Sequence, residues 1–226
     1  MMSRKLAVAW SGGKDSALAL HRLIGSGEYE INTLLTTITE EFDRVSMHGV
    51  RTRLLEQQAA SLGFDIRKVL VPKECTNEIY ESRMRAAVES LLSKGISAIA
   101  FGDIFLEEVR RFRESNLSGT GIEPVFPLWK TNTAEMARRF VDLGFKAIVT
   151  CVDSEALDMS FVGRELDHRF LSDLPPSVDP CGENGEFHTF VHYGPMFKRR
   201  VLFDIGETVL RNKRFYFIDL VPRDST

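Results

Sequence analysis

The 226-residue sequence contains few cysteines, and none of them form a closely spaced pair. Cys75, Cys151 and Cys181 are an odd number of cysteines, separated by long intervals and without a Cys-x-x-Cys motif. This pattern excludes a disulfide framework and the usual spacing of zinc and iron–sulfur ligands. It also fits a reducing compartment, so we expect a cytoplasmic protein.

Long apolar runs and a strong charge are also missing. No stretch approaches the roughly 18 apolar residues of a membrane span, and the N-terminal run 6–10 is too short for a signal peptide. A net charge of -3 and a pI near 6.0 exclude a global field that attracts nucleic acid. We therefore expect neither membrane nor nucleic-acid partners, although three basic clusters keep RNA as an alternative: 110–113, 198–200 and 211–214.

Apolar runs that alternate with amphipathic stretches predict an α/β protein, in which a parallel sheet carries helices on both faces. After about residue 153, short aromatic or alternating strands predict a smaller α+β portion. We therefore expect a nucleotide-binding domain over 1–153 and a second domain over 154–226, although no linker-like segment marks the boundary. The predicted strands are 6–10, 31–37, 66–71, 98–102, 124–126 and 147–152, then 187–193, 201–205 and 215–221; the predicted helices include 132–141 and 163–174.

The first predicted strand runs into Ser11-Gly12-Gly13-Lys14-Asp15-Ser16, and a helical pattern follows immediately. Two glycines permit a tight turn, the new helix offers unpaired N–H groups, and Lys14 adds a positive charge. The spacing differs from a Walker A loop, whose first glycine precedes Gly-Lys by four residues. The segment predicts a phosphate-binding loop; a plain Gly-Gly turn with Asp15 capping the helix is the alternative.

Ligands of parallel sheets bind beyond the carboxyl ends of the strands. The ends of other strands are therefore expected to belong to the same site as the phosphate loop. Thr36 lies near the end of the second strand, and Gly102 and Asp103 end the fourth. His48 lies in the connection after the second strand. We expect Thr36, Gly102 and Asp103 to help to bind the nucleotide, although Asp103 is equally suited to a turn.

A second motif, Gly182-Glu183-Asn184-Gly185-Glu186-Phe187-His188-Thr189, precedes the strand 187–193. Two carboxylates three residues apart in a glycine-rich loop can hold an ammonium group, coordinate Mg²⁺ or act as a base. A solvated acidic turn is the alternative.

The first motif resembles the loop of the PP-loop ATP pyrophosphatases. The two motifs together resemble the diphthine–ammonia ligase family, which pairs Ser-Gly-Gly-Lys-Asp-Ser with a later Gly-Glu-Gly-Gly-Glu-Phe/Tyr-Glu-Thr. His48 and three further segments match in the same order, so that the resemblance spans most of the chain: 127–129, 163–164 and 166–167. It implies an adenine nucleotide alpha hydrolase-like fold.

The resemblance implies that the chain adenylates a carboxylate with ATP, releases pyrophosphate and amidates the acyl-adenylate with ammonia. Lys14, Asp15, Glu183 and Glu186 would then be catalytic, with Asp15 as a ligand of Mg²⁺ or as a helix cap. The ATP site would contain Ser11, Gly12, Gly13, Lys14, Asp15 and Ser16; the acceptor site would contain Gly182, Glu183, Gly185, Glu186 and His188. The family position of His48 implies that it belongs to the ATP site, and a surface residue at the start of a helix is the alternative. The acceptor is a small molecule or a modified protein residue, and self-association of the chain stays open.

The chain departs from the family motif at two positions. His188 replaces a glutamate, which removes a negative charge and adds a group that titrates near neutral pH, and Asn184 replaces a glycine. His188 therefore suggests a different acceptor, or simply a packing role. Two other functions stay open: RNA thiolation through Cys151 or Cys181, and nucleotide sensing without catalysis.

Overall fold

The computed structural model describes residues 3–45 and 49–223, which form two β-sheets. The first sheet has six strands in the order β3-β2-β1-β5-β6, with β4 paired to the other side of β2. All of its pairings are parallel except the short antiparallel contact of β3 with β2. Its strands are β1 (Arg4–Ala9), β2 (Tyr29–Thr39), β3 (Arg44–Val45), β4 (Asp65–Val71), β5 (Ala98–Ala100) and β6 (Glu123–Val125).

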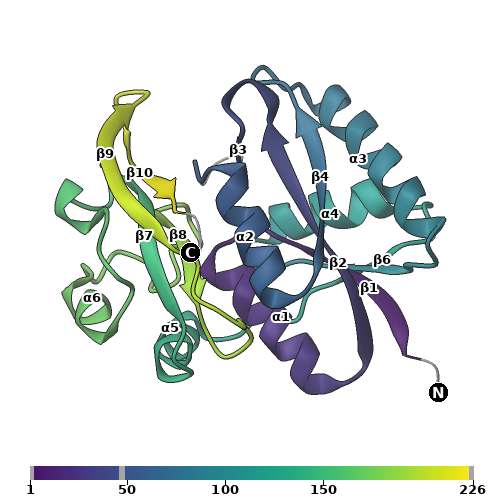
Figure 1. The fold of residues 1–226 in the computed structure, drawn as a ribbon, viewed down its shortest axis with the longest axis horizontal. Helices are drawn as coiled ribbons and strands as arrows, with labels where there is room; N and C mark the ends of the chain where they lie inside the picture. The colour runs from purple at the N-terminus through teal and green to yellow at the C-terminus, as the bar shows by residue number, and fades with distance from the viewer. Residues whose placement is uncertain (1–2, 46–48, 224–226) are drawn as a thin grey trace.

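Helices cover both faces of this sheet, as predicted (Figure 1). On one face lie α1 (Lys14–Ser26) and α2 (Thr52–Leu62), and on the other lie α3 (Asn77–Leu92) and α4 (Glu107–Leu117). Because both faces are covered, the central strands consist of apolar residues with no exposed side; Leu6, Ala7 and Val8 of β1 are all fully buried. The sheet therefore supplies the rigid strand ends on which a ligand site can be built.

The second sheet is antiparallel and has the order β8-β7-β10-β9. It contains β7 (Lys146–Asp153), β8 (Phe187–Tyr193), β9 (Phe203–Arg211) and β10 (Phe215–Pro222). The segment 147–152 was predicted as a strand of the parallel sheet, and this is wrong: β7 pairs antiparallel with β8 and β10. Its apolar run is buried on both faces in either sheet, so the run itself does not reveal its partners.

Helices and turns complete the second half. The predicted cap of α5 (Thr133–Asp142) is present, because the Asn132 side chain accepts a hydrogen bond from the Glu135 amide at 3.0 Å. The predicted helix 163–174 is limited to α6 (His168–Asp173), because Glu165 forms a β-bridge with Ile148 and Asp167 caps the helix. Two short 3-10 helices lie at η1 (Glu40–Phe42) and η2 (Met159–Phe161).

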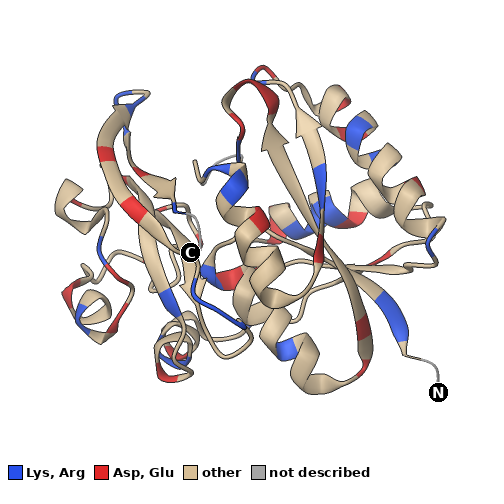
Figure 2. Cartoon of the chain, viewed as in Figure 1, with Lys and Arg blue, Asp and Glu red and all other residues tan. Residues whose placement is uncertain are grey.

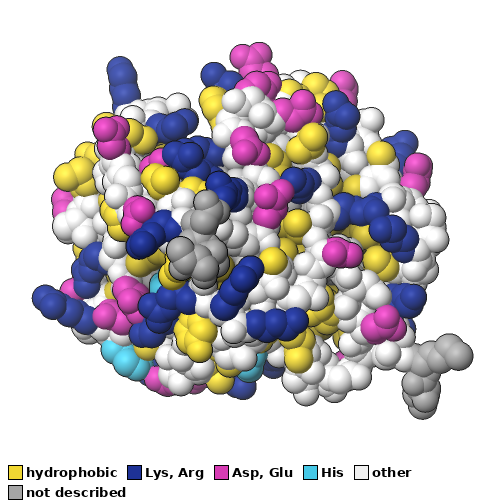
Figure 3. Space-filling view, in the orientation of Figure 1, with side chains coloured by type: hydrophobic (Ala, Val, Ile, Leu, Met, Phe, Trp, Pro, Cys, Tyr) yellow, Lys and Arg dark blue, Asp and Glu magenta, His cyan; other side chains and the backbone are white. Residues whose placement is uncertain are grey.

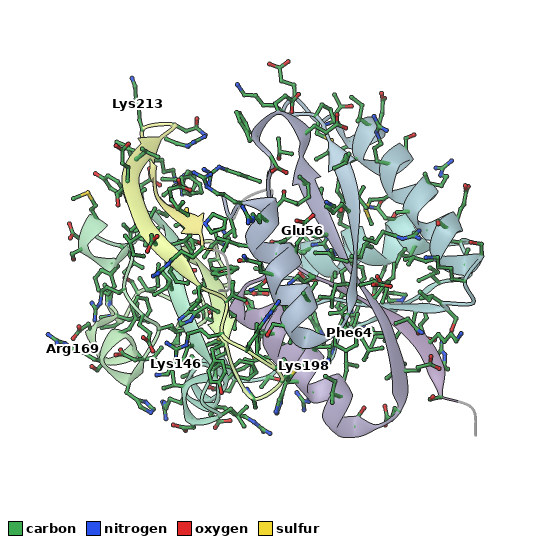
Figure 4. The ribbon with its side chains drawn as sticks, in the orientation of Figure 1. Glu56, Phe64, Lys146, Arg169, Lys198 and Lys213 are labelled. Carbon is green, nitrogen blue, oxygen red and sulfur yellow. The ribbon has the colours of Figure 1, made fainter. Side chains whose placement is uncertain are left out.

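A continuous hydrophobic core joins the two sheets. It contains residues of β1, α1 and α2 together with residues of β7 and β8 from the second sheet. Figure 1 shows α1 and α2 between the two sheets, and Figure 4 shows Lys198, from the loop after β8, beside α2. The Lys198 amide donates to the Ser61 carbonyl at 2.9 Å, which fixes this loop to α2. No helix of the described residues is long and apolar enough to cross a membrane.

His192 of β8 is buried between the second sheet and its neighbouring side chains. Neither ring nitrogen has a hydrogen-bond partner among the described residues, and the ring packs edge-on against Phe203. Burial, followed by the nearby Arg200, lowers the pKa of His192 to about 4. The unfolded chain therefore binds a proton below a pH of about 6.5 that the folded chain does not bind.

We predict that His192 lowers the free energy of unfolding by up to about 3 kcal/mol as the pH drops from about 6.5 to 4, measured as the difference between the wild type and His192→Phe. The difference isolates His192 from other groups that titrate in this range, such as Glu183, whose raised pKa acts in the opposite direction. Urea unfolding across this pH range measures the effect, with His168→Gln as the control, since the side chain of His168 is exposed. An unchanged slope in His192→Phe would contradict the prediction.

Candidate functional site

A cavity of about 900 Å³ lies at the carboxyl ends of the parallel strands. This volume is in the range of sites for small molecules and cofactors. The phosphate-loop segment forms one wall, α3 and α4 form another, and the loop before β8 forms a third. Of the predicted site residues, the cavity brings together Ser11, Lys14, Asp15, Ser16, Thr36, Gly102, Asp103, Gly182, Glu183, Gly185 and His188.

The predicted phosphate loop is a tight turn that leads directly into α1. Gly13 is the N-cap of α1, so the alternative in which Asp15 caps the helix is wrong: Asp15 lies in the first turn. Gly12 has a φ of 79°, which favours glycine. The Gly13 amide donates to Ser11 Oγ at 3.2 Å, and Ser16 Oγ donates to the Gly13 carbonyl at 2.9 Å. The loop is therefore held by its own hydroxyl groups.

Gln58 of α2 holds the loop in place through hydrogen bonds, and it was not among the predicted site residues. Its side chain is fully buried, accepts from Trp10 Nε1 at 2.9 Å, and donates to the carbonyls of Gly12 and Val191. A Cβ atom on Gly12 would lie only 2.7 Å from Gln58 Oε1. A single buried amide thus connects the strand before the loop, the loop and β8, and its only sequence signal is a polar residue on the apolar face of a helix.

Strand β8 of the second sheet also bonds to the loop. The Lys14 amide donates to Thr189 Oγ1 at 3.0 Å, and the Val191 amide donates to the Gly12 carbonyl at 2.9 Å. Thr189 ends the second sequence motif but was not predicted as a site residue. These bonds explain why two motifs far apart in the sequence share one site.

Lys14 and Asp15 form an ion pair inside the site. Lys14 Nζ lies 2.8 Å from Asp15 Oδ2 and 5.4 Å from the centre of the Phe187 ring, and Lys14 is 3% exposed. Burial is the largest influence and acts to lower the pKa of Lys14, but the charge and hydrogen bond of Asp15, together with the nearby Cys181 and Glu183, outweigh it and raise the pKa above its ordinary value. Lys14 is therefore a fixed positive charge at neutral pH.

Glu183 connects the second motif to the parallel sheet. Its Oε1 atom accepts the Ile104 amide at 2.7 Å and the Phe105 amide at 3.4 Å, just after β5. Burial raises the pKa of Glu183 to about 7, against the lowering effect of the bond from Ile104. A carboxyl group that ionises near neutral pH and lines the cavity is suited to act as a general base.

Glu186 was predicted with Glu183 but is directed into its own loop rather than toward the cavity. It is buried, and Oε1 accepts the Asp179 amide and the Asn184 side-chain amide, both at 2.9 Å. Asn184, which replaces a glycine of the family motif, thus supports Glu186. The arrangement gives Glu186 a role in shaping the loop from which Glu183 extends.

The strand-end residues lie where the sequence placed them. Gly102 is packed so closely on α1 that a Cβ atom would be 3.0 Å from the Asp15 carbonyl carbon. The buried Thr36 Oγ1 atom lines the cavity and has no hydrogen-bond partner among the described residues. His48 lies outside the described residues. Gly12 and Gly13 do not line the cavity.

The residues of the loop fit a magnesium ion that is held jointly with phosphate groups. Asp15 Oδ1 is buried at the cavity and has no hydrogen-bond partner in the described chain. Carboxylate oxygen suits Mg²⁺, which commonly takes one or two carboxylates plus substrate phosphates. Within residues 3–45 and 49–223, no cluster of three or more metal-ligating side chains is present, so an all-protein metal cage is not formed there.

The cysteines and basic clusters do not support an RNA-thiolation site at this cavity. Cys151 and Cys181 are buried outside the cavity; burial raises the pKa of Cys151 to about 12 and raises that of Cys181 as well. Among the basic residues, Arg110 stacks on Phe126 and Trp129, and Arg214 pairs with Asp153. Figure 2 shows Lys and Arg positions interspersed with Asp and Glu positions along the ribbon, and Figure 3 shows both kinds of side chain on the visible face.

Comparisons with known proteins match both halves of the chain. Residues 4–123 match the diphthamide synthase N-terminal domain, and residues 132–220 match the diphthamide synthase C-terminal domain. The diphthine–ammonia ligase of Homo sapiens is 24% identical over 92% of this chain and 86% of its own length; that of Bos taurus is 25% identical over 91% and 85%. A U34-tRNA thiolase, NcsA from Methanococcus maripaludis, aligns at 14% identity with a TM-score of 0.39, covering 63% of this chain and 58% of its own.

Proposed function

Because the chain belongs to the diphthamide synthase family, we propose that it is a ligase that uses ATP to join a carboxylate and ammonia into an amide. The observation that carries the proposal is the shared cavity: a phosphate loop with a buried lysine faces a carboxyl group that titrates near neutral pH. The relatives are named diphthine–ammonia ligases, so diphthine is the first acceptor to test.

In the first step, a carboxylate oxygen of the acceptor attacks the α-phosphate of ATP, and the bond to the β-phosphate breaks. This gives an acyl-adenylate and pyrophosphate. Lys14 and the start of α1 stabilise the negative charge that develops on the leaving pyrophosphate. Burial strengthens this effect because Lys14 already has a fixed position and needs no reorganisation.

Asp15 Oδ1 is the atom that would hold Mg²⁺, which when bound to the phosphates would neutralise part of their charge. The Lys14–Asp15 pair keeps that carboxylate next to the loop. Ser11 and Ser16 add hydroxyl groups beside it.

In the second step, ammonia attacks the acyl carbon, and AMP leaves as the amide forms. Ammonium must lose a proton to become nucleophilic, and the nitrogen loses another as the amide forms. Glu183 is placed to accept one of these protons, since its pKa is about 7 and its position is fixed by the Ile104 amide. Acceptor selection then belongs to the surrounding wall, in which His188 replaces the family glutamate.

The decisive test is product analysis with the purified full-length chain. Diphthine, ATP, Mg²⁺ and ammonium should yield AMP, pyrophosphate and the amide in equal amounts. Formation of ADP and phosphate, or tight ATP binding without any pyrophosphate across a panel of carboxylates, would overturn the proposal.

We predict that Glu183→Gln separates the two steps. Amide formation should fall about 100-fold, since a general base contributes about that much or more. Acceptor-dependent pyrophosphate exchange should persist, because it does not need ammonia. The wild-type amidation rate should rise with pH through about 7 as Glu183 loses its proton, and this rise should vanish in the variant.

Free ammonia must be kept constant across the pH series, because ammonium itself titrates. Glu108→Gln is the matched control, since Glu108 lines the same cavity from α4 and is exposed. An identical pH profile for wild type and Glu183→Gln would remove Glu183 from the base role.

RNA thiolation is the weaker alternative on the same geometry. It requires a sulfur nucleophile at the cavity, whereas neither Cys151 nor Cys181 lines it, and burial raises the pKa of both thiols. Retention of full activity in Cys151→Ser and Cys181→Ser would eliminate this alternative.

A further inference from the structure

The described walls of the cavity carry more acidic than basic side chains. The acidic residues on its described walls are Asp15, Asp103, Glu108 and Glu183. The lysine and arginine residues on the same walls are Lys14 and Arg113. Lys14 is paired with Asp15 inside the phosphate loop. An acceptor that enters as a carboxylate must therefore approach a largely acidic wall, and Arg113, at a longer distance from its carboxylate neighbour Asp103 than Lys14 from Asp15, is the other strong cation on the described walls.

Arg113 is held in a defined orientation on α4. Its guanidinium lies over the ring of the buried Phe101, 5.1 Å from the ring centre. Arg113 Nε lies 3.5 Å from Asp103 Oδ2, and Nη1 lies 3.5 Å from the Tyr80 hydroxyl. Stacking on an aromatic ring and a neighbouring carboxylate fix the plane of the guanidinium without using its full capacity of five donors.

The contacts of Arg113 with polar protein groups are long. Arg113 Nε and Asp103 Oδ2 are both buried and face each other at 3.5 Å, and neither has a hydrogen-bond partner among the described residues. The contact of Nη1 with the Tyr80 hydroxyl is equally long, so the guanidinium keeps hydrogen-bond donors that a ligand in the cavity can use. The ligand for a planar cation with free donors is an anion with two oxygens.

The position of Arg113 places this anion next to the reacting groups. Asp103, which contacts Arg113, directly follows Gly102, and Gly102 is packed against Asp15 at the phosphate loop. The next residue, Ile104, donates its amide to Glu183. Arg113 thus adjoins the short segment that connects the phosphate loop to Glu183.

We propose that Arg113 is the specificity-determining residue that binds the acceptor carboxylate. This inference rests on the proposed function and assigns a residue to its substrate. The guanidinium neutralises the carboxylate as it enters the acidic cavity and orients one oxygen for the attack on ATP. The amide product has no negative charge, so it binds more weakly at the same place and leaves.

The first experiment compares steady-state kinetics of the full-length chain with diphthine as acceptor. Arg113→Gln should raise the KM for diphthine at least 30-fold and change the KM for ATP less than threefold. The KM of Arg113→Lys for diphthine should lie between those of the wild type and Arg113→Gln, because an ammonium group cannot bind a carboxylate with two parallel hydrogen bonds. Arg111→Gln, on the exposed side of the same helix, should match the wild type.

The second experiment does not need turnover. Side-chain NMR of the Arg113 Nε–H group is followed during titration with acetate and with acetamide at constant ionic strength. Acetate should shift the signal and saturate, and acetamide should not. The Arg113→Lys variant identifies the signal by its loss, and its thermal unfolding confirms that the fold is intact.

The two experiments separate the two proposals. If acetate shifts the Arg113 signal but diphthine is not a substrate, the carboxylate site stands and the proposed function fails. If diphthine is amidated and Arg113→Gln retains the wild-type KM, the Arg113 inference is overturned. Equal shifts with acetate and acetamide would also overturn it.

Discussion

Replacing Lys14 by methionine is expected to lower pyrophosphate formation about 1000-fold, which corresponds to about 4 kcal/mol of transition-state stabilisation. Methionine fills nearly the same volume but carries no charge for the leaving pyrophosphate. The described walls of the cavity then retain four acidic residues and Arg113. ATP binding should weaken as well, because the loop loses its buried positive charge. Pyrophosphate release and ATP affinity are the quantities to measure.

Folding should be much less affected than activity in this variant. Asp15 loses its partner, but its side chain is 28% exposed and can take up a proton. The double variant Lys14→Met with Asp15→Asn should recover the free energy of unfolding without recovering activity. Lys5→Met, at an exposed position of β1, is the control for loss of a surface charge. If Lys14→Met loses stability and activity in proportion, the loop assignment is wrong.

Replacing Gly12 by alanine is expected to destabilise the fold strongly. Its φ of 79° strains any residue with a Cβ atom, at about 1–2 kcal/mol. The Cβ atom would also lie 2.5 Å from Leu55 Cδ2 and 2.7 Å from Gln58 Oε1, both of which are fully buried. Overpacking of this kind adds about 1–3 kcal/mol. We expect a total loss of about 3 kcal/mol in urea unfolding, together with weak ATP binding.

Gly119→Ala provides the matched comparison. Gly119 has a φ of 72°, and a Cβ atom there would meet nothing within 4 Å. It therefore measures the backbone strain without the steric clash. The difference in the free energy of unfolding between the two variants isolates the clash with α2. Equal decreases in both would show that α2 accommodates the methyl group without loss of stability.

The local part of the fold could be predicted from the sequence. The apolar run of β1, the two glycines and the helical pattern of α1 are adjacent in the chain, so one segment contains the whole signal. The partner of β7 could not be predicted in the same way, because the choice between two sheets depends on residues distant in sequence. Helix α4 was missed because its residues 110–113 are mostly arginine and were interpreted as a surface cluster.

The residues of the candidate site also divide into those that a rule about the sequence predicts and those that depend on contacts distant in sequence. The strand-end rule gathered Thr36, Gly102 and Asp103 at one cavity, since it depends only on the direction of parallel strands. The different environments of Glu183 and Glu186 could not be predicted, because both are glutamates of one short loop and only the folded turn directs them differently. Gln58 acts through contacts with three separate segments, which no local pattern contains.

Two hydrogen bonds join the loop to β8: the Lys14 amide donates to Thr189 Oγ1, and the Val191 amide donates to the Gly12 carbonyl. The conformation of the loop therefore depends on both sheets. A fragment confined to the parallel sheet would keep every glycine of the turn yet leave its peptide groups facing water and the flank of α1 bare. If the loop binds phosphate as proposed, a displacement of β8 would also displace the loop, because these two hydrogen bonds join them.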